Sequence, residues 1–156
     1  MSSAPPKQES TPLVLHVDAI EHQPPESFPD ANTGGNVSWK TLLSAPQTQT
    51  DTLTAGIATC PPGQSAGCAG HLKPHRHSHA ELYHVTSGTG VVTIDGVEHE
   101  VRKGSVVYIP GDAEHGVQNT GKDEFKWLYV FAADGFGEIV YRFDEDGVKG
   151  RIQAKL

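Results

Sequence analysis

Histidines are concentrated in one short stretch of the sequence. Residues 75–88 read HRHSHAELYHVTSG, which places four of the nine histidines of the chain beside a glutamate and a tyrosine. An imidazole ring needs a partner at one or both nitrogens, so a cluster of rings is costly unless one group satisfies them together. A metal ion fits this requirement, and the stretch therefore predicts a metal site.

The spacing of these residues suits ligands carried on neighbouring strands. Side chains two apart on a strand share a face, so His75 and His77 can point at one centre. Glu81 and Tyr83 share a face in the same way, after a tight turn. His115 follows Glu81 by 34 residues, about the length needed to run out and back through hairpins. Three histidines and one carboxylate leave positions of a divalent metal open for substrate or water, which catalysis requires.

The composition predicts an all-β domain that could position these ligands. A chain of 156 residues, 36% of them hydrophobic, can bury one substantial core. Glycines and prolines separate short runs rich in Val, Ile, Thr and aromatic residues, and helical periodicity is not sustained anywhere. Roughly eight or more short strands at 8–12-residue spacing predict one sandwich or barrel. The runs are SWKTLLS (38–44), LTAGIATC (53–60), ELYHVTS (81–87), GVVTI (90–94), VEHEVR (97–102), KGSVVYIPGD (103–112), HGVQN (115–119), FKWLYVFAA (125–133) and GEIVYRF (137–143).

Two regions follow from the distribution of core-forming residues. The first dozen residues are rich in Ser, Pro and Gln, and the segment 21–35 is equally poor in core formers. We therefore predict a mobile N-terminal arm over residues 1–36 and an ordered barrel domain over residues 37–156. Within the domain, Asp95-Gly96 is the strongest hairpin signal.

Charge and cysteine content narrow the function classes. The formal net charge of −7, without clustered Lys and Arg, argues against a nucleic-acid surface and favours small-molecule partners. No apolar run is long enough for a membrane span and the N-terminus does not resemble a signal peptide, so we expect a cytoplasmic location. Cys60 and Cys68 are expected to be free thiols. A role of Cys68 in metal binding or thiol chemistry stays open, because it lies near the histidines.

Two motifs in this order resemble the paired motifs of the cupin superfamily. The first, HxH(x)3E(x)6G, runs from His75 to Gly88, and the second, G(x)5PxD(x)2H(x)3N, runs from Gly104 to Asn119. The resemblance covers residues 53–142. Gly70 lies one residue nearer the first motif than the family pattern expects. In the second motif Asp112 stands where a glycine is usual, which alters a turn but puts no ligand in doubt.

The resemblance implies a single jelly-roll barrel, a homodimer and one divalent transition metal such as iron, manganese, nickel or zinc. The ligands that it implies are His75, His77, Glu81 and His115. His77 and His79 would also place two rings on one face, but the family spacing to Glu81 makes His79 a turn histidine.

The same residues are similar to those of the small cupin-type dimethylsulfoniopropionate lyases. In that family the metal binds the substrate carboxylate, and a tyrosine removes the proton beside it, so that dimethyl sulfide leaves and acrylate remains. Carried over by position, the base is Tyr83; the alternative is a core aromatic residue whose hydroxyl bonds a ligand. Trp127, Tyr129 and Tyr141 could line a pocket for the sulfonium cation, or could be plain barrel core.

Two other functions stay open at this point. The same ligand set serves Fe(II) cupin dioxygenases of thiol, aromatic or diketone substrates, and oxygen consumption would distinguish them from a lyase. A non-enzymatic cupin would bind a small molecule without turnover.

Overall fold

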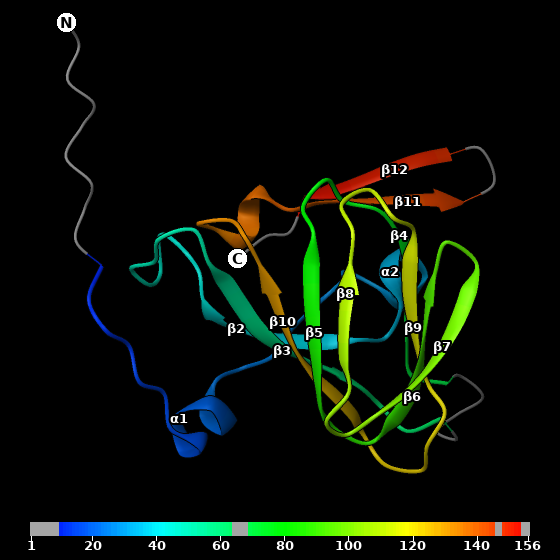
Figure 1. The fold of residues 1–156 in the computed structure, drawn as a ribbon, viewed down its shortest axis with the longest axis horizontal. Coiled ribbons are helices and arrows are strands. Elements are labelled where there is room, and N and C mark those ends of the chain that lie inside the picture. Colours follow the sequence, from blue (N-terminus) through cyan, green and yellow to red (C-terminus); the bar gives the residue numbers. More distant parts are fainter. Residues whose placement is uncertain (1–9, 64–68, 146–147, 154–156) are drawn as a thin grey trace, which may run out of the picture.

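Two antiparallel sheets face each other in the computed structural model, which describes residues 10–63, 69–145 and 148–153 (Figure 1). The first sheet contains, in spatial order, β1 (Glu26–Ser27), β2 (Ser38–Leu43), β3 (Thr54–Cys60), β10 (Phe125–Phe131), β5 (Glu81–Ser87) and β8 (Val106–Ile109). The second contains β4 (His71–His75), β9 (His115–Asn119), β6 (Thr89–Ile94) and β7 (Val97–Arg102). A separate hairpin of β11 (Val140–Glu145) and β12 (Val148–Gln153) lies at one end of the barrel.

Alternating burial explains why these runs pair into a closed core. Buried residues alternate with partly exposed ones along β3 and β10, and the first six residues of β5 alternate between buried and exposed. This period of two turns one face of each strand inward. The core comprises Val85, Val92, Ile109, Phe125, Trp127 and Phe131 among others. The predicted all-β jelly-roll barrel is confirmed.

The predicted strands are found with small changes at their ends. Asp95 and Gly96 form the β6–β7 turn with φ values of 47° and 80°, as the hairpin signal requires. Pro110, which lacks an N–H, follows the last residue of β8. The last predicted strand starts later, at Val140, because the 3-10 helix η1 (Phe136–Glu138) precedes it and buries Phe136.

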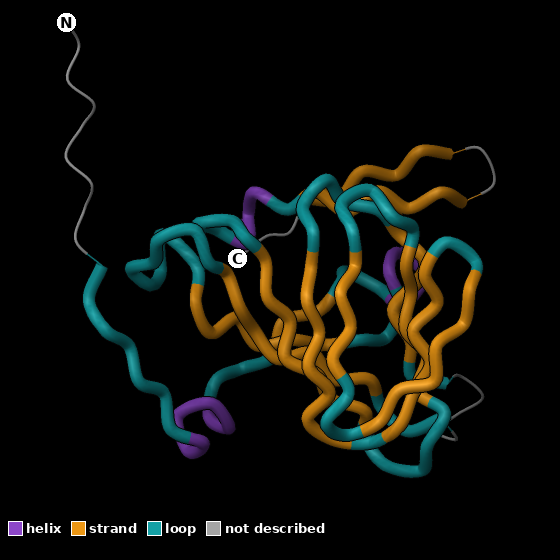
Figure 2. Tube along the Cα trace, in the orientation of Figure 1, coloured by secondary structure: helices purple, strands orange, loops and turns teal. Residues whose placement is uncertain are grey.

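Three short elements lie in the stretch that the sequence assigned to an arm: α1 (Val17–His22), β1 and α2 (Ala31–Gly34). Figure 2 shows that, apart from these helices and η1, the described chain consists of strands and loops. The Lys40 ammonium on β2 donates to two carbonyl oxygens of α1, and the Asp30 carboxylate caps α2. Such polar contacts leave no hydrophobic pattern in the sequence. The domain boundary at residue 36 stays a prediction.

Nowhere in the described ranges is there a helix with the length and apolar content needed to cross a membrane.

A glycine allows the close packing of β3 against a buried tyrosine. Gly56 pairs with Tyr129 across β3 and β10. A Cβ atom at position 56 would lie 2.2 Å from the Tyr129 hydroxyl and 2.6 Å from the backbone oxygen of Lys40. Both distances are shorter than atoms tolerate, so only glycine fits without movement of the strand or of the ring.

We expect Gly56→Ala to lower the free energy of unfolding by about 1–3 kcal/mol, because an added methyl group in a filled core forces its neighbours apart. Ala55→Ser is the matched control, since it also adds one heavy atom but on the opposite face of the same strand. Urea unfolding of both variants measures the difference. Equal stabilities would contradict the close packing at Gly56.

Candidate metal centre

Four buried polar side chains meet inside the barrel. His75 ends β4, His115 begins β9, and the two residues face each other in the register of these strands. His77 follows β4 by two residues, and Glu81 begins β5. The exposed fractions of the three histidines are 1% each, and that of Glu81 is 4%. In the described part of the chain, ring nitrogens of the three histidines form a group of candidate metal ligands within 4.8 Å of one another.

A bulge in β4 turns His75 inward. The register joins Leu72 to Val117 and His75 to His115, so β4 has one more residue than β9 between these pairs. Leu72 and His75 are therefore both buried, although they differ in parity, while Pro74 between them is exposed. Proline suits a bulge because it has no N–H to donate to the ladder. This bulge was not predicted from the sequence.

The Nδ1 atoms of the three histidines are all engaged by the backbone. Carbonyl oxygens only accept hydrogen bonds, so each Nδ1 must carry the proton. The acceptors for His75, His77 and His115 are the oxygens of Lys73, His79 and Ala113, at 2.8, 2.8 and 2.9 Å. In a neutral ring this arrangement leaves the Nε2 lone pair free to bind a metal.

The Glu81 carboxylate shows that the cluster needs a positive charge. Its Oε2 atom lies 3.1 Å from His77 Nε2 and 3.2 Å from His115 Nε2. Because the Nδ1 atoms hold the ring protons, two neutral rings would direct lone pairs at a carboxylate oxygen, which is repulsive. His75 Nε2 is buried without a hydrogen-bond partner among the described residues. A divalent metal would satisfy the ring nitrogens of the three histidines, so this donor set fits one. Glu81, the predicted fourth ligand, contacts two of these rings but is not part of the group of candidate ligands.

The pKa shifts of these side chains also indicate that the cluster requires a positive charge. Burial and the neighbouring His115 and His77 hold the pKa of His75 well below 6.5. Burial opposes ionisation of Glu81, but hydrogen bonds to His115 and His77 outweigh it, so the pKa of Glu81 is lowered. Burial alone would lower the pKa of His77. The hydrogen bond and the charge of Glu81 outweigh burial, so the pKa of His77 is raised. A metal must displace this proton, so its affinity falls as pH falls.

Two tyrosines flank the cluster. Tyr83 is buried on the same face of β5 as Glu81, and its ring centroid lies 6.4 Å from that of His115. Burial and the Glu81 carboxylate raise the pKa of Tyr83 well above 10. The ring of Tyr141, on β11, lies nearer, with centroids 4.8 Å from His75 and 5.5 Å from His77.

The other predicted aromatic residues form a layer behind these. Trp127 packs on Tyr83 at 5.4 Å between ring centroids, and Tyr129 packs on Phe131 at 6.0 Å. Phe131 itself lies 5.1 Å from His77 and so lines the site directly. The sequence analysis did not predict Phe131 as a site residue, although it has the same inward parity as Trp127 and Tyr129 on β10.

Phe143 was also not selected, and its ring lies 5.6 Å from His75. It shares the parity of Tyr141 on β11, which is the signal that could have found it.

The remaining sequence candidates lie elsewhere. His79 contributes its backbone oxygen to His77, and its ring is not part of the cluster. Cys60 is a free, buried thiol, and burial raises its pKa to about 12. Cys68 lies outside the described residues.

Comparison with known proteins agrees with this geometry. The family described as "Cupin domain" matches residues 56–131. The chain is 43% identical over 111 residues to the dimethylsulfoniopropionate lyase DddW of Ruegeria pomeroyi, covering 71% of this chain and 68% of that protein. The chain belongs to the cupin family, as its two motifs predict.

Solved structures share the fold at lower identity. A predicted oxalate decarboxylase from Thermotoga maritima has a TM-score of 0.64 at 21% identity, covering 78% of this chain and 99% of that one. The polyketide cyclase RemF from Streptomyces resistomycificus has a TM-score of 0.63 at 18% identity, covering 78% and 79%. Both show the same barrel.

In the metal-free protein, we expect NMR titration to place the pKa of His77 above 6.5 and that of His75 well below it. In Glu81→Gln, the pKa of His77 should fall below 6.5, because burial remains while the carboxylate charge is gone. The ring signals of exposed His99 serve as the reference that the substitution leaves unchanged. A His77 pKa that does not respond would contradict the coupling to Glu81.

Proposed function

We propose that this chain is a metal-dependent lyase that cleaves dimethylsulfoniopropionate into dimethyl sulfide and acrylate. The observation that carries the proposal is the buried cluster of three histidines and a glutamate flanked by two tyrosines. It occurs in a chain that is 43% identical to a protein named for that activity. A small-molecule substrate suits such an enclosed site. The cytoplasmic location and the homodimer stay predictions.

His75, His77, His115 and Glu81 would hold one divalent metal, such as iron, manganese, nickel or zinc. When bound, the metal supplies positive charge that attracts the substrate carboxylate, stabilises charge on the adjacent carbon and lowers the pKa of a nearby phenol. The Nδ1 hydrogen bonds to backbone oxygens keep the three rings oriented toward that point.

Tyr83 is the proposed base. Its phenolate oxygen would take a proton from the carbon beside the carboxylate. The electron pair of that C–H bond then forms the C=C bond of acrylate as the C–S bond breaks, and the sulfur keeps the C–S pair and leaves as neutral dimethyl sulfide. Burial of Tyr83 excludes water that could otherwise reprotonate the carbon.

Tyr141 and Phe131 would form the wall for the sulfonium group. Their rings lie next to the histidine cluster, and aromatic faces attract cations. Tyr129 would support the wall from behind through Phe131, and Trp127 would support the proposed base, Tyr83. The proposal therefore assigns direct substrate contact to Tyr141 among the three aromatic residues predicted from the sequence.

The first test supplies dimethylsulfoniopropionate, under nitrogen, to protein loaded separately with Fe(II), Mn(II), Ni(II) and Zn(II). Dimethyl sulfide is then measured in the headspace. Tyr83→Phe should lower the rate by about 10²–10⁴-fold with the metal still bound, as expected for loss of a general base. Tyr141→Phe keeps the aromatic face and should lose only about tenfold or less. It is the matched control, because it also removes one buried hydroxyl group beside the cluster.

Failure with every metal would contradict the lyase proposal. Oxygen uptake with thiols or diketones would then identify a dioxygenase, and tight binding without turnover would identify a binding protein. A rate lost in Tyr141→Phe but kept in Tyr83→Phe would assign the base to Tyr141 instead.

The ligand set is tested separately by metal content. We expect His75→Ala to abolish stable metal binding, because it removes one of three inward-facing nitrogens. His79→Ala should retain the metal, since His79 serves the site only through its backbone oxygen. Elemental analysis of the purified variants measures bound metal per chain. Loss in His79→Ala with retention in His75→Ala would overturn the assignment.

A further inference from the structure

The turn before His115 has an unusual backbone. Asp112 adopts a φ of 63°, in the left-handed region that favours glycine. The corresponding position of the cupin motif is usually glycine, whereas this chain keeps a residue with a side chain. Aspartate tolerates this conformation better than most residues, but glycine would adopt it without strain. The Asp112 carboxylate can therefore make a side-chain contact that a glycine at this position could not make.

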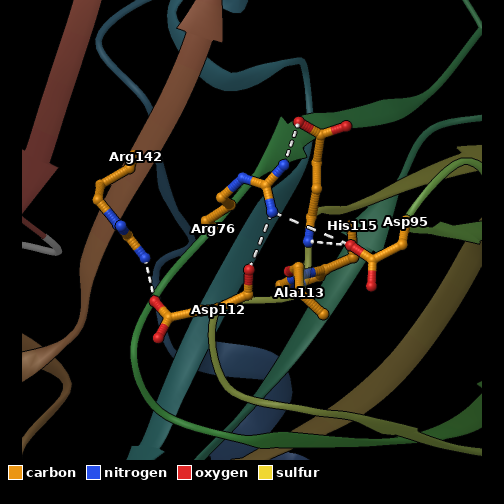
Figure 3. A network of polar contacts seen from close by, with 7 residues as sticks. Arg76, Asp95, Asp112, Ala113, His115 and Arg142 are labelled. Carbon is orange, nitrogen blue, oxygen red and sulfur yellow. Dashed lines mark hydrogen bonds and ion pairs between the residues drawn. The ribbon is translucent and has the colours of Figure 1, made fainter.

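Asp112 contacts His77, Arg76 and Arg142, and Figure 3 shows its contacts with Arg76 and Arg142. Its N–H donates to the backbone oxygen of His77 at 2.8 Å. Its own carbonyl oxygen accepts from the Arg76 guanidinium at 3.0 Å. Its carboxylate accepts a hydrogen bond from the guanidinium of Arg142. One residue thus contacts the segment that carries His75 and His77 as well as strand β11.

Arg142 holds β11 against that segment. Its N–H and carbonyl oxygen both pair with the backbone of Arg76, at 2.8 and 2.9 Å. In the described chain this bridge is isolated, because β11 pairs along its length only with β12 and joins neither large sheet. Tyr141, the residue before Arg142, lies against His75. The ring of Tyr141 also packs on Phe28 and Phe136, and the contacts of Arg142 help to fix its backbone.

A second set of contacts fixes the other side of the turn. The backbone N–H of Glu114 donates to the Asp95 carboxylate at 2.9 Å. The backbone N–H of Asp95 donates to the backbone oxygen of Glu114 at 2.8 Å. The Arg76 guanidinium lies 3.4 Å from the Glu114 carboxylate. The segment leading into His115 is thus held by β11, by the β6–β7 turn and by Arg76.

These ion pairs are exposed, which limits their contribution to stability. The side chains of Arg142 and Asp112 are 39% and 65% exposed. Solvent-exposed pairs of this kind contribute little to folding, so the structural cost of losing one is small. The effect of this pair on the geometry of the site is larger. Arg142 follows Tyr141 in the chain, and Asp112 contacts the backbone of His77.

We propose that Asp112 and Arg142 form a positioning pair, which holds Tyr141 against the cluster and fixes the relative places of His77 and His115 for metal binding. The inference rests on the metal site in the proposed function but not on the substrate. Neither residue is assigned to direct contact with the metal or with the substrate.

The test is Co(II) binding to the full-length, metal-free protein, followed by visible absorption and by competition with a chelator. Asp112→Gly should weaken binding by about tenfold and alter the Co(II) spectrum, as is typical when partners that orient ligands are removed. Its melting temperature without metal should stay within about 4 °C of the original, because an exposed pair is lost and a strained φ is relieved.

Arg142→Met should have the same effect, and the double variant should lose no more than either single one. Arg142→Lys, which keeps the charge, should retain most of the affinity. Arg102→Met is the control, since Arg102 is exposed at the far end of β7 from the Asp95 turn. Unchanged Co(II) affinity and spectrum in Asp112→Gly, additive losses in the double variant, or a large fall in melting temperature would each overturn the pairing. Co(II) binding by a protein that releases no dimethyl sulfide with Fe(II), Mn(II), Ni(II) or Zn(II) would contradict only the proposed function.

Discussion

A carboxylate buried against two imidazole rings is the interaction on which the rest of this structure depends. Removing one partner of a buried ion pair typically costs about 3–5 kcal/mol, because the remaining charge is left uncompensated. Glu81 therefore requires either protonated histidines or a metal ion beside it. The backbone oxygens that bind the Nδ1 atoms leave the Nε2 atoms to meet this requirement. The local charge and the metal affinity of the site follow from this requirement of Glu81.

Much of this arrangement could be predicted because its signals are local in sequence. Strand runs such as ELYHVTS show a period of two, and this period also puts Glu81 and Tyr83 on one face. The His-x-His spacing is equally short-range. The bulge at Pro74 could not be predicted, because it is defined by the register with β9. Without it, His75 would share the parity of the half-buried His71 and Lys73 rather than the inward face of Leu72.

Other features could not be predicted because they are made by residues far apart in the chain. The sequence marks Asp112 only as a departure from a motif, and its partner Arg142 lies 30 residues away on another strand. The contact of Lys40 with α1 spans about 20 residues and involves backbone oxygens, which carry no sequence signature. Phe131 and Phe143 have the parity of predicted residues, but parity alone does not say which of several inward rings reaches the histidines.

The strands divide the chemical tasks between them. The histidines come from β9 and from the end of β4 and the residues after it, and the carboxylate comes from the start of β5. The aromatic wall comes instead from β10 and β11. Under the proposed function, changes in the wall would alter which molecule fits without moving a metal ligand, provided that β11 keeps its place. Because β11 joins neither large sheet, its place is held by the backbone bridge to Arg76, by the ion pair with Asp112 and by the packing of Tyr141 and Phe143 on Phe28. Under the proposed function, the exposed contact between Arg142 and Asp112 would therefore affect which molecule the buried site accepts.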